Sequence, residues 1–162
     1  MKRTALLASA AGAVLALSVG SSALASNVHF KSGSVPKFED NGLTLTSTGS
    51  LTGLGNGDVT VNLTADGQPI ATCTNPSGAN QPAGQNPAKF VVRGSVTIPG
   101  SFIKNGNLNF SVTTNAPPTP VPGAPGCPNK NWTETIVDVV FSHPAIGVVQ
   151  GGSTVLSYSG SL

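Results

Sequence analysis

Few side chains in this 162-residue sequence are of the types that carry out acid–base or nucleophilic chemistry. His29 and His143 stand near opposite ends of the chain, and a lone histidine at a strand edge is usually structural. Serines are numerous, but none lies in the Gly-x-Ser-x-Gly pattern that presents a hydrolase nucleophile on a sharp turn. Four carboxylates could supply a glycosidase pair, yet no spacing relates them: Asp58, Asp66, Glu134 and Asp138. We therefore predict no catalytic residue.

The sequence also predicts no cofactor and no metal site. Cys73 and Cys127 lack the CxxC spacing that is typical of zinc sites. Glu39 and Asp40 precede Asn41-Gly42, so we interpret them as turn residues. Weak calcium binding is the alternative for this pair, although one such pair falls short of the six or more oxygen ligands that calcium requires.

The N-terminal segment has the three parts of an export signal. Met1-Lys2-Arg3 is positively charged, residues 5–20 are mostly apolar, and Ala23-Leu24-Ala25 is a small-residue cleavage pattern. The apolar run is shorter than the roughly 20 residues that a bilayer core requires. We therefore predict a signal peptide over residues 1–25, a secreted or cell-surface location, and no membrane insertion of the mature chain.

Cleavage at this position would leave an electrically neutral domain. Removing Lys2 and Arg3 from the eight basic residues leaves six, which balance the six acidic residues. The alkaline isoelectric point of the whole sequence therefore belongs to the precursor. A neutral domain has no electrostatic attraction for nucleic acid or anionic membranes, so we predict no nucleic-acid partner.

The elements that must position the remaining side chains are β-strands. Apolar and polar residues alternate, with many β-branched or aromatic side chains, over residues 43–46, 59–64, 91–98, 108–112, 135–141 and 154–158. Turn signals separate these segments: Asn56-Gly57, Asp66-Gly67, Asn105-Gly106 and Gly151-Gly152, with Pro69, Pro99 and Pro144. We predict that residues 26–162 form a single all-β domain, an immunoglobulin-like β-sandwich of about seven to nine strands.

Two cysteines in an exported chain predict one disulfide, between Cys73 and Cys127. Each cysteine lies in a long Gly- and Pro-rich stretch, residues 73–88 and 115–131, which we expect to be loops that the disulfide joins at one end of the sandwich. Long ordered loops often carry function. The residues that we single out there as a possible binding surface are Trp132, Asn75, Asn80 and Gln85. For Trp132, packing over the disulfide or anchoring a strand is the alternative to binding.

Several short motifs carry a resemblance when they are taken as a set. These are Cys73-Thr74-Asn75-Pro76, residues 103–107, residues 122–129, Asn131-Trp132-Thr133 and Val149-Gln150-Gly151-Gly152. Together they resemble a group of uncharacterised short exported β-rich proteins of filamentous Gram-positive bacteria. The resemblance spans most of residues 26–162 and implies a bacterial extracellular setting. It implies no activity and no site residues.

Two functions remain open at this point. The first is a non-catalytic secreted or cell-surface module that binds an extracellular protein or a cell-wall component, or has a structural role at the surface. The second is a small secreted hydrolase or protease inhibitor acting through the loops around Cys73 and Cys127. A pocket with convergent polar groups would favour the enzyme, whereas smooth loops with an apolar patch would favour binding.

Overall fold

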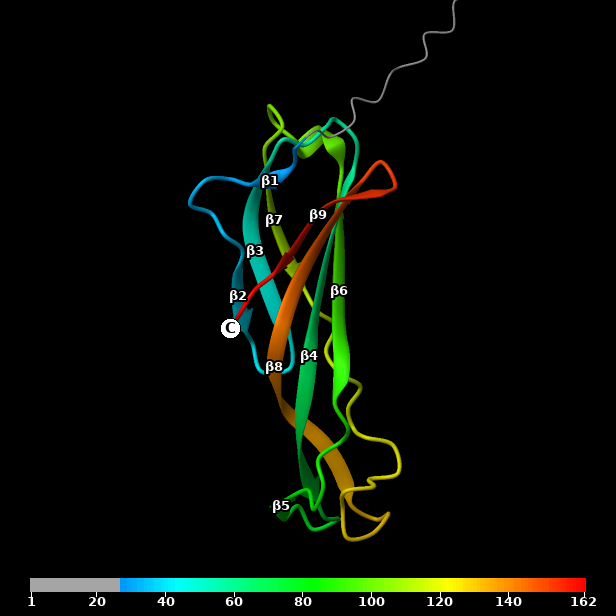
Figure 1. Cartoon of the computed structure of the whole chain (residues 1–162). Helices are drawn as coiled ribbons and strands as arrows, with labels where there is room; N and C mark the ends of the chain where they lie inside the picture. The colour runs from blue at the N-terminus through cyan, green and yellow to red at the C-terminus, as the bar shows by residue number, and fades with distance from the viewer. Residues whose placement is uncertain (1–26) are drawn as a thin grey trace, which may run out of the picture.

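Two antiparallel sheets pack against each other in the computed structural model, which describes residues 27–162 (Figure 1). The predicted signal peptide, residues 1–25, lies outside the described residues. The elements are β1 (His29–Phe30), β2 (Lys37–Asp40), β3 (Leu45–Thr52), β4 (Val59–Thr74), β5 (Asn80–Pro82), β6 (Phe90–Ile98), the 3₁₀ helix η1 (Gly100–Phe102), β7 (Leu108–Thr113), β8 (Thr133–Gln150) and β9 (Ser153–Ser159). These nine strands confirm the all-β, sandwich-like prediction for the described part of the chain. The immunoglobulin-like type of sandwich stays a prediction.

One sheet is centred on β3 and the other on the pair β4 and β8. Strand β7 pairs with one edge of β3, while β1 and β2 follow each other along its opposite edge. In the second sheet, β6 and β5 follow each other along one edge of β4, β8 pairs with its other edge, and β9 pairs with β8. Both sheets are antiparallel throughout, as the hairpin signals Asn105-Gly106 and Gly151-Gly152 require. All four of these residues have positive φ.

The core lies where the two sheets overlap. Strand alternation turns Val59, Val61 and Leu63 of β4 inward, and these side chains are fully buried against the first sheet. Burying a side chain of this size stabilises the fold by about 1.5–3 kcal/mol. Phe110 of β7 covers Gly49 of β3, where a Cβ would lie 2.8 Å from the phenyl ring. The glycine therefore makes room for the largest side chain of that part of the core.

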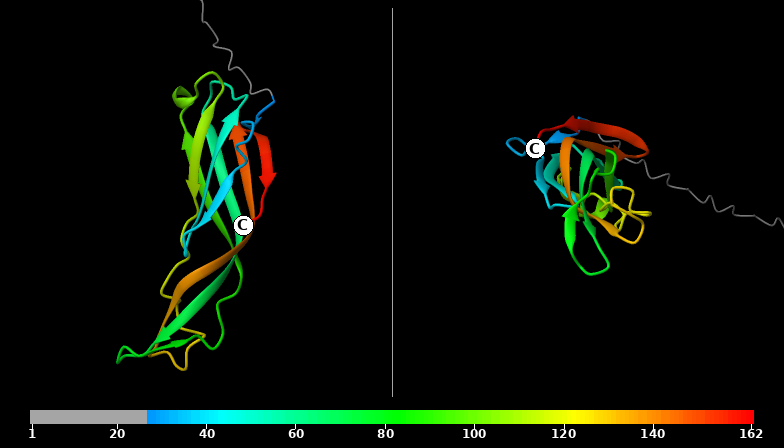
Figure 2. Two further views of the ribbon diagram at one scale, coloured as in Figure 1. Left: turned by 90° about the vertical axis from the view of Figure 1, so that its left-hand side faces the viewer. Right: turned by 90° about the horizontal axis from the view of Figure 1, so that it is seen from below.

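Strands β4 and β8 continue well beyond the first sheet, as Figures 1 and 2 show. The first sheet ends at the turn after β2, where the Val139 amide of β8 donates a hydrogen bond to the Gly42 carbonyl. We call the part beyond this point the distal arm. It consists of residues 67–74 of β4, residues 133–141 of β8, strand β5, and the loops 83–89 and 114–132.

The length of β4 and β8 corrects three sequence predictions. Asp66-Gly67, expected at a turn, lies inside β4 at an irregularity of its pairing with β8. Pro69, expected to separate strands, lies in β4 between the last residue paired with β6 and the first paired with β5. No ladder partner needs its missing N–H there. Pro144 lies inside β8 at the same irregularity as Asp66, and strand prolines are tolerated at bulges.

Candidate functional site

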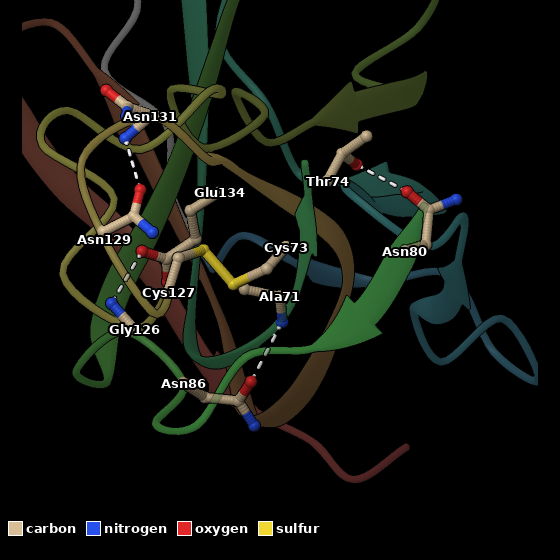
Figure 3. Close-up of a disulfide and its surroundings, with 10 residues drawn as sticks. All are labelled: Ala71, Cys73, Thr74, Asn80, Asn86, Gly126, Cys127, Asn129, Asn131 and Glu134. Carbon is tan, nitrogen blue, oxygen red and sulfur yellow. Dashed lines mark hydrogen bonds between the residues drawn. A yellow bond between two sulfur atoms is a disulfide. The ribbon is translucent and has the colours of Figure 1, made fainter. Parts of the chain in front are cut away.

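The disulfide predicted from the sequence joins Cys73 to Cys127, with their Cα atoms 5.6 Å apart (Figure 3). Its position differs from the prediction in one respect. Cys127 lies in the loop 114–132, but Cys73 is a buried, inward-facing residue near the end of β4. The bond therefore ties a loop to a strand rather than a loop to a loop. The sequence suggested otherwise because Pro76 and Gly78, which end the strand, follow so soon after Cys73.

The inward face of β4 changes character along its length. Val59, Val61 and Leu63 are large, whereas the inward residues that follow are small or lack a flexible side chain: Ala65, Gly67, Pro69, Ala71 and Cys73. The large residues pack in the core between the sheets, whereas a Cβ on Gly67 would meet side chains of β8 and β6, and Cys73 bonds to the loop 114–132. This decrease in side-chain size along the inward face of β4 is the sequence signal for the point where the opposing sheet ends.

Hydrogen bonds hold the two loops against the strands and against each other. The Ala71 amide donates to the Asn86 side-chain oxygen at 2.9 Å, and the Ala83 amide donates to the Ala71 carbonyl at 3.2 Å. The Gly84 amide donates to the Gly126 carbonyl at 2.8 Å, which joins the loop 83–89 to the loop 114–132. The distal arm is thus cross-linked covalently and by backbone hydrogen bonds.

Two of the four predicted surface residues organise the tip of the arm. The Asn75 side-chain oxygen accepts hydrogen bonds from the amides of Ser77 and Ala79, which closes the turn between β4 and β5. The Asn80 side-chain oxygen accepts a hydrogen bond of 2.6 Å from the Thr74 hydroxyl (Figure 3). Both side chains therefore have structural partners at the tip, and any role in binding stays a prediction.

The other two predicted residues, Gln85 and Trp132, line separate hollows. Loop residues 85–88, Pro125, Gly126 and Glu134 surround a hollow of about 210 Å³, which we call the glutamate hollow. Residues 120–124, Lys130, the half-buried Trp132, Thr133 and Glu134 surround one of about 320 Å³, which we call the tryptophan hollow. Glu134 lines both, so the two hollows adjoin across a single residue.

Glu134 is the residue that sequence reasoning missed. It was grouped with three other carboxylates, but the structure buries it to 1% exposure beside the disulfide. One carboxylate oxygen, Oε2, accepts a hydrogen bond of 3.0 Å from the Gly126 amide, and the other, Oε1, has no hydrogen-bond partner. The available signal was alternation, because Glu134 and Ile136 occupy successive inward positions of β8.

The two histidines lie outside the distal arm, whereas the candidate carboxylate Asp138 lies on β8 within it. His143 Nδ1 and Asp66 Oδ2 are 3.0 Å apart on the exposed outer face of the second sheet. The other histidine, His29, contacts the Asn27 carbonyl through Nδ1 at 2.7 Å. Among residues 27–162 there is no group of three or more His, Cys, Asp or Glu side chains that could hold a metal ion. The same residues contain no helix long and apolar enough to cross a membrane.

Comparison of this chain with protein-family models, with curated proteins and with solved structures gave no match. The functional conclusion therefore rests on the geometry of the distal arm.

Proposed function

We propose that this chain is an exported, non-catalytic binding module, an immunoglobulin-like sandwich that holds an extracellular partner at its distal arm. The observation that carries the proposal is the pair of adjoining hollows: the disulfide ties the loop 114–132 to β4, and a backbone hydrogen bond joins that loop to the loop 83–89. Loops that are already ordered lose little conformational entropy when a partner binds. An arm that extends beyond the core also presents these loops away from the rest of the surface.

The chemistry of the tryptophan hollow favours a cell-wall polymer as the partner. Trp132 supplies an aromatic face on which a sugar ring can stack, and prolines at positions 120 and 122 extend the apolar wall. Lys130 adds a positive charge to the same hollow, which suits the anionic groups of wall polymers. An extracellular protein is the other outcome of the test.

Co-sedimentation with purified, insoluble cell walls tests this proposal. Trp132→Ala should lower the bound fraction about tenfold, because a stacking contact contributes on the order of 1 kcal/mol or more. Phe102→Ala is the matched control, since Phe102 is 66% exposed in η1, outside the distal arm. Equal binding by both variants would place the wall contact elsewhere, and capture of one soluble protein in a Trp132-dependent manner would favour a protein partner.

A further inference from the structure

Strand β9 is an edge strand with one unpaired side. It pairs with β8, and among residues 27–162 no strand pairs with its other side, which lies at the margin of the molecule in Figure 2. The Gly160 amide donates a hydrogen bond of 2.9 Å to the Pro144 carbonyl. Because hydrogen-bonded pairs alternate along an antiparallel ladder, the main-chain N–H and C=O groups of Ser157 and Ser159 face away from β8. These groups can pair with a further strand.

The sequence of β9 carries none of the usual protections of a sheet edge. Natural edge strands avoid pairing with other chains through charged side chains, proline or short length. Residues 149–162, which include the seven residues of β9, contain no Asp, Glu, Lys, Arg, His or Pro. Tyr158 packs against Phe30 and Phe38, with ring centroids 5.3 and 6.5 Å apart, so the strand is held in place on the sandwich. Strand β9 is therefore an ordered, uncharged edge.

The other described edges are short, charged or covered. Strands β1 and β5 have two and three residues. The outer edges of β6 and β7 approach each other, and the Asn115 amide donates a hydrogen bond of 2.8 Å to the Arg93 carbonyl there. In the distal arm, the Val121 amide donates to the Glu134 carbonyl at 2.8 Å and covers β8. Strand β2 has four residues, of which three are charged: Lys37, Glu39 and Asp40.

We propose that two copies of this protein form a twofold dimer by antiparallel pairing of their β9 strands. A pairing centred on Ser157 places this residue opposite the same residue of the second copy, and Val155 opposite Ser159. Self-pairing of a strand brings identical side chains together, so it requires a segment without charge, because like charges directly opposite each other are destabilising. The exposed hydroxyls of Ser157 and Ser159 meet this requirement.

The twofold arrangement limits the assembly to two copies. Each β9 edge is used once, so no uncharged edge remains for a third copy. Antiparallel pairing also reverses the direction of the second copy, which places the two distal arms at opposite ends of the dimer. This inference does not depend on the partner proposed for the distal arm. The contact adds main-chain hydrogen bonds and little apolar surface, and small interfaces are typical of weak complexes.

Sedimentation equilibrium of the native, disulfide-bonded protein between about 10 μM and 1 mM tests the dimer. The mass should rise to twice that of the monomer and no further. Ser157→Pro should weaken dimerisation about tenfold or more, because symmetry makes one substitution remove two hydrogen bonds between the copies. The Ser157 N–H faces away from β8, so the proline leaves the β8–β9 ladder intact. Ser157→Ala keeps the N–H and is the matched control, which should dimerise like the wild type.

Three results would overturn the proposal. The first is a monomer at every concentration. The second is a Ser157→Pro variant that keeps the circular dichroism of the strands and dimerises as tightly as the wild type. The third is growth beyond two copies, which would show an open rather than a twofold contact.

Cross-linking gives a second measurement that does not depend on whether Ser157→Pro folds. Opposite residues of a hydrogen-bonded antiparallel pair have Cα atoms about 5.5 Å apart, a distance that a disulfide spans. Both native cysteines are already bonded, so Ser157→Cys introduces the single free thiol. Air oxidation should link Ser157→Cys into dimers about tenfold faster than Ser95→Cys, a control at an exposed position of β6 in the same sheet. Equal rates would place the contact elsewhere and overturn the proposal.

Discussion

Four polar side chains are buried in the described part of this protein, and they differ in how well they are satisfied. Gln150 exchanges three hydrogen bonds with the backbone of Gly55 and Gly57, and Thr114 accepts one from the Leu45 amide. Ser47 and Glu134 each keep an oxygen without a partner. The hydrogen bonds of Gln150 and Thr114 join loops to strand ends, which explains why these two side chains are buried. Nothing in the structure explains why the Ser47 hydroxyl is left without a partner.

Removing the Ser47 hydroxyl should therefore not harm the fold. Ser47 is fully buried in β3, and its hydroxyl has no hydrogen-bond partner. Replacing it with alanine removes the cost of desolvating the hydroxyl and breaks no hydrogen bond. We expect Ser47→Ala to change the free energy of unfolding by between zero and about +1 kcal/mol, measured by denaturant titration. Thr48→Ala, at the exposed neighbouring position, is the control and should lie within about 0.5 kcal/mol of the wild type. A clear loss of stability in Ser47→Ala would mean that the hydroxyl has a partner in solution.

At the scale of elements, β4 combines two environments in one continuous strand. Its first half faces a sheet and its second half faces loops, and the size of its inward side chains changes at the boundary. Asp66-Gly67 and Pro69 do not interrupt the strand. Asp66 lies at an irregularity of the pairing with β8, and Pro69 lies between the residues that pair with β6 and those that pair with β5. The disulfide secures the half that has no opposing sheet.

Removing either cysteine should destabilise this half of the strand by the same amount. The bond joins residues 54 positions apart, for which the chain-entropy model gives about 4 kcal/mol, and measured losses are commonly 2–4 kcal/mol. We expect Cys73→Ala and Cys127→Ala to match each other in denaturant titrations and to retain the circular dichroism of the strands. Unequal losses, or a free thiol in the oxidised wild type, would contradict an intact Cys73–Cys127 bond in solution.

The molecule as a whole has two parts of unequal construction. The sandwich is held by a hydrophobic core between two sheets, whereas the distal arm has no second sheet and is held by the pairing of β4 with β8 and β5, by one disulfide and by loop hydrogen bonds. Apolar burial between two sheets gives high local stability, and its scarcity gives low local stability. The arm is therefore the part whose order depends on cross-links.

Hydrogen exchange with and without reductant should separate the two parts. In the oxidised protein we expect slow exchange in both β4 residues 59–64 and β4 residues 69–74. Reduction should speed exchange about tenfold or more in residues 69–74 and in the loop 114–132, while residues 59–64 stay protected. Cys127→Ala without reductant is the control for effects of the reagent itself. Uniform acceleration along β4 would show instead that the arm and the sandwich unfold as one unit.

The sequence by itself determined the properties that depend on neighbouring residues. Alternation along short segments predicted the strands, Asn105-Gly106 and Gly151-Gly152 predicted turns with positive φ, and two cysteines predicted one disulfide. Within the candidate site, the sequence singled out Cys73, Cys127, Gln85 and Trp132. It did not single out Glu134, which lines both hollows.

Only the tertiary structure decided what covers each strand face. Asp66-Gly67 and Pro69 predict turns locally, but pairing with β8, β6 and β5 keeps them in one strand. Glu134 is inward by alternation, yet its burial depends on Gly126 and Gln85, loop residues that reach it only through the fold. The burial of a polar group and its hydrogen bonds depend on residues that are distant in the chain. The local sequence pattern therefore does not predict them.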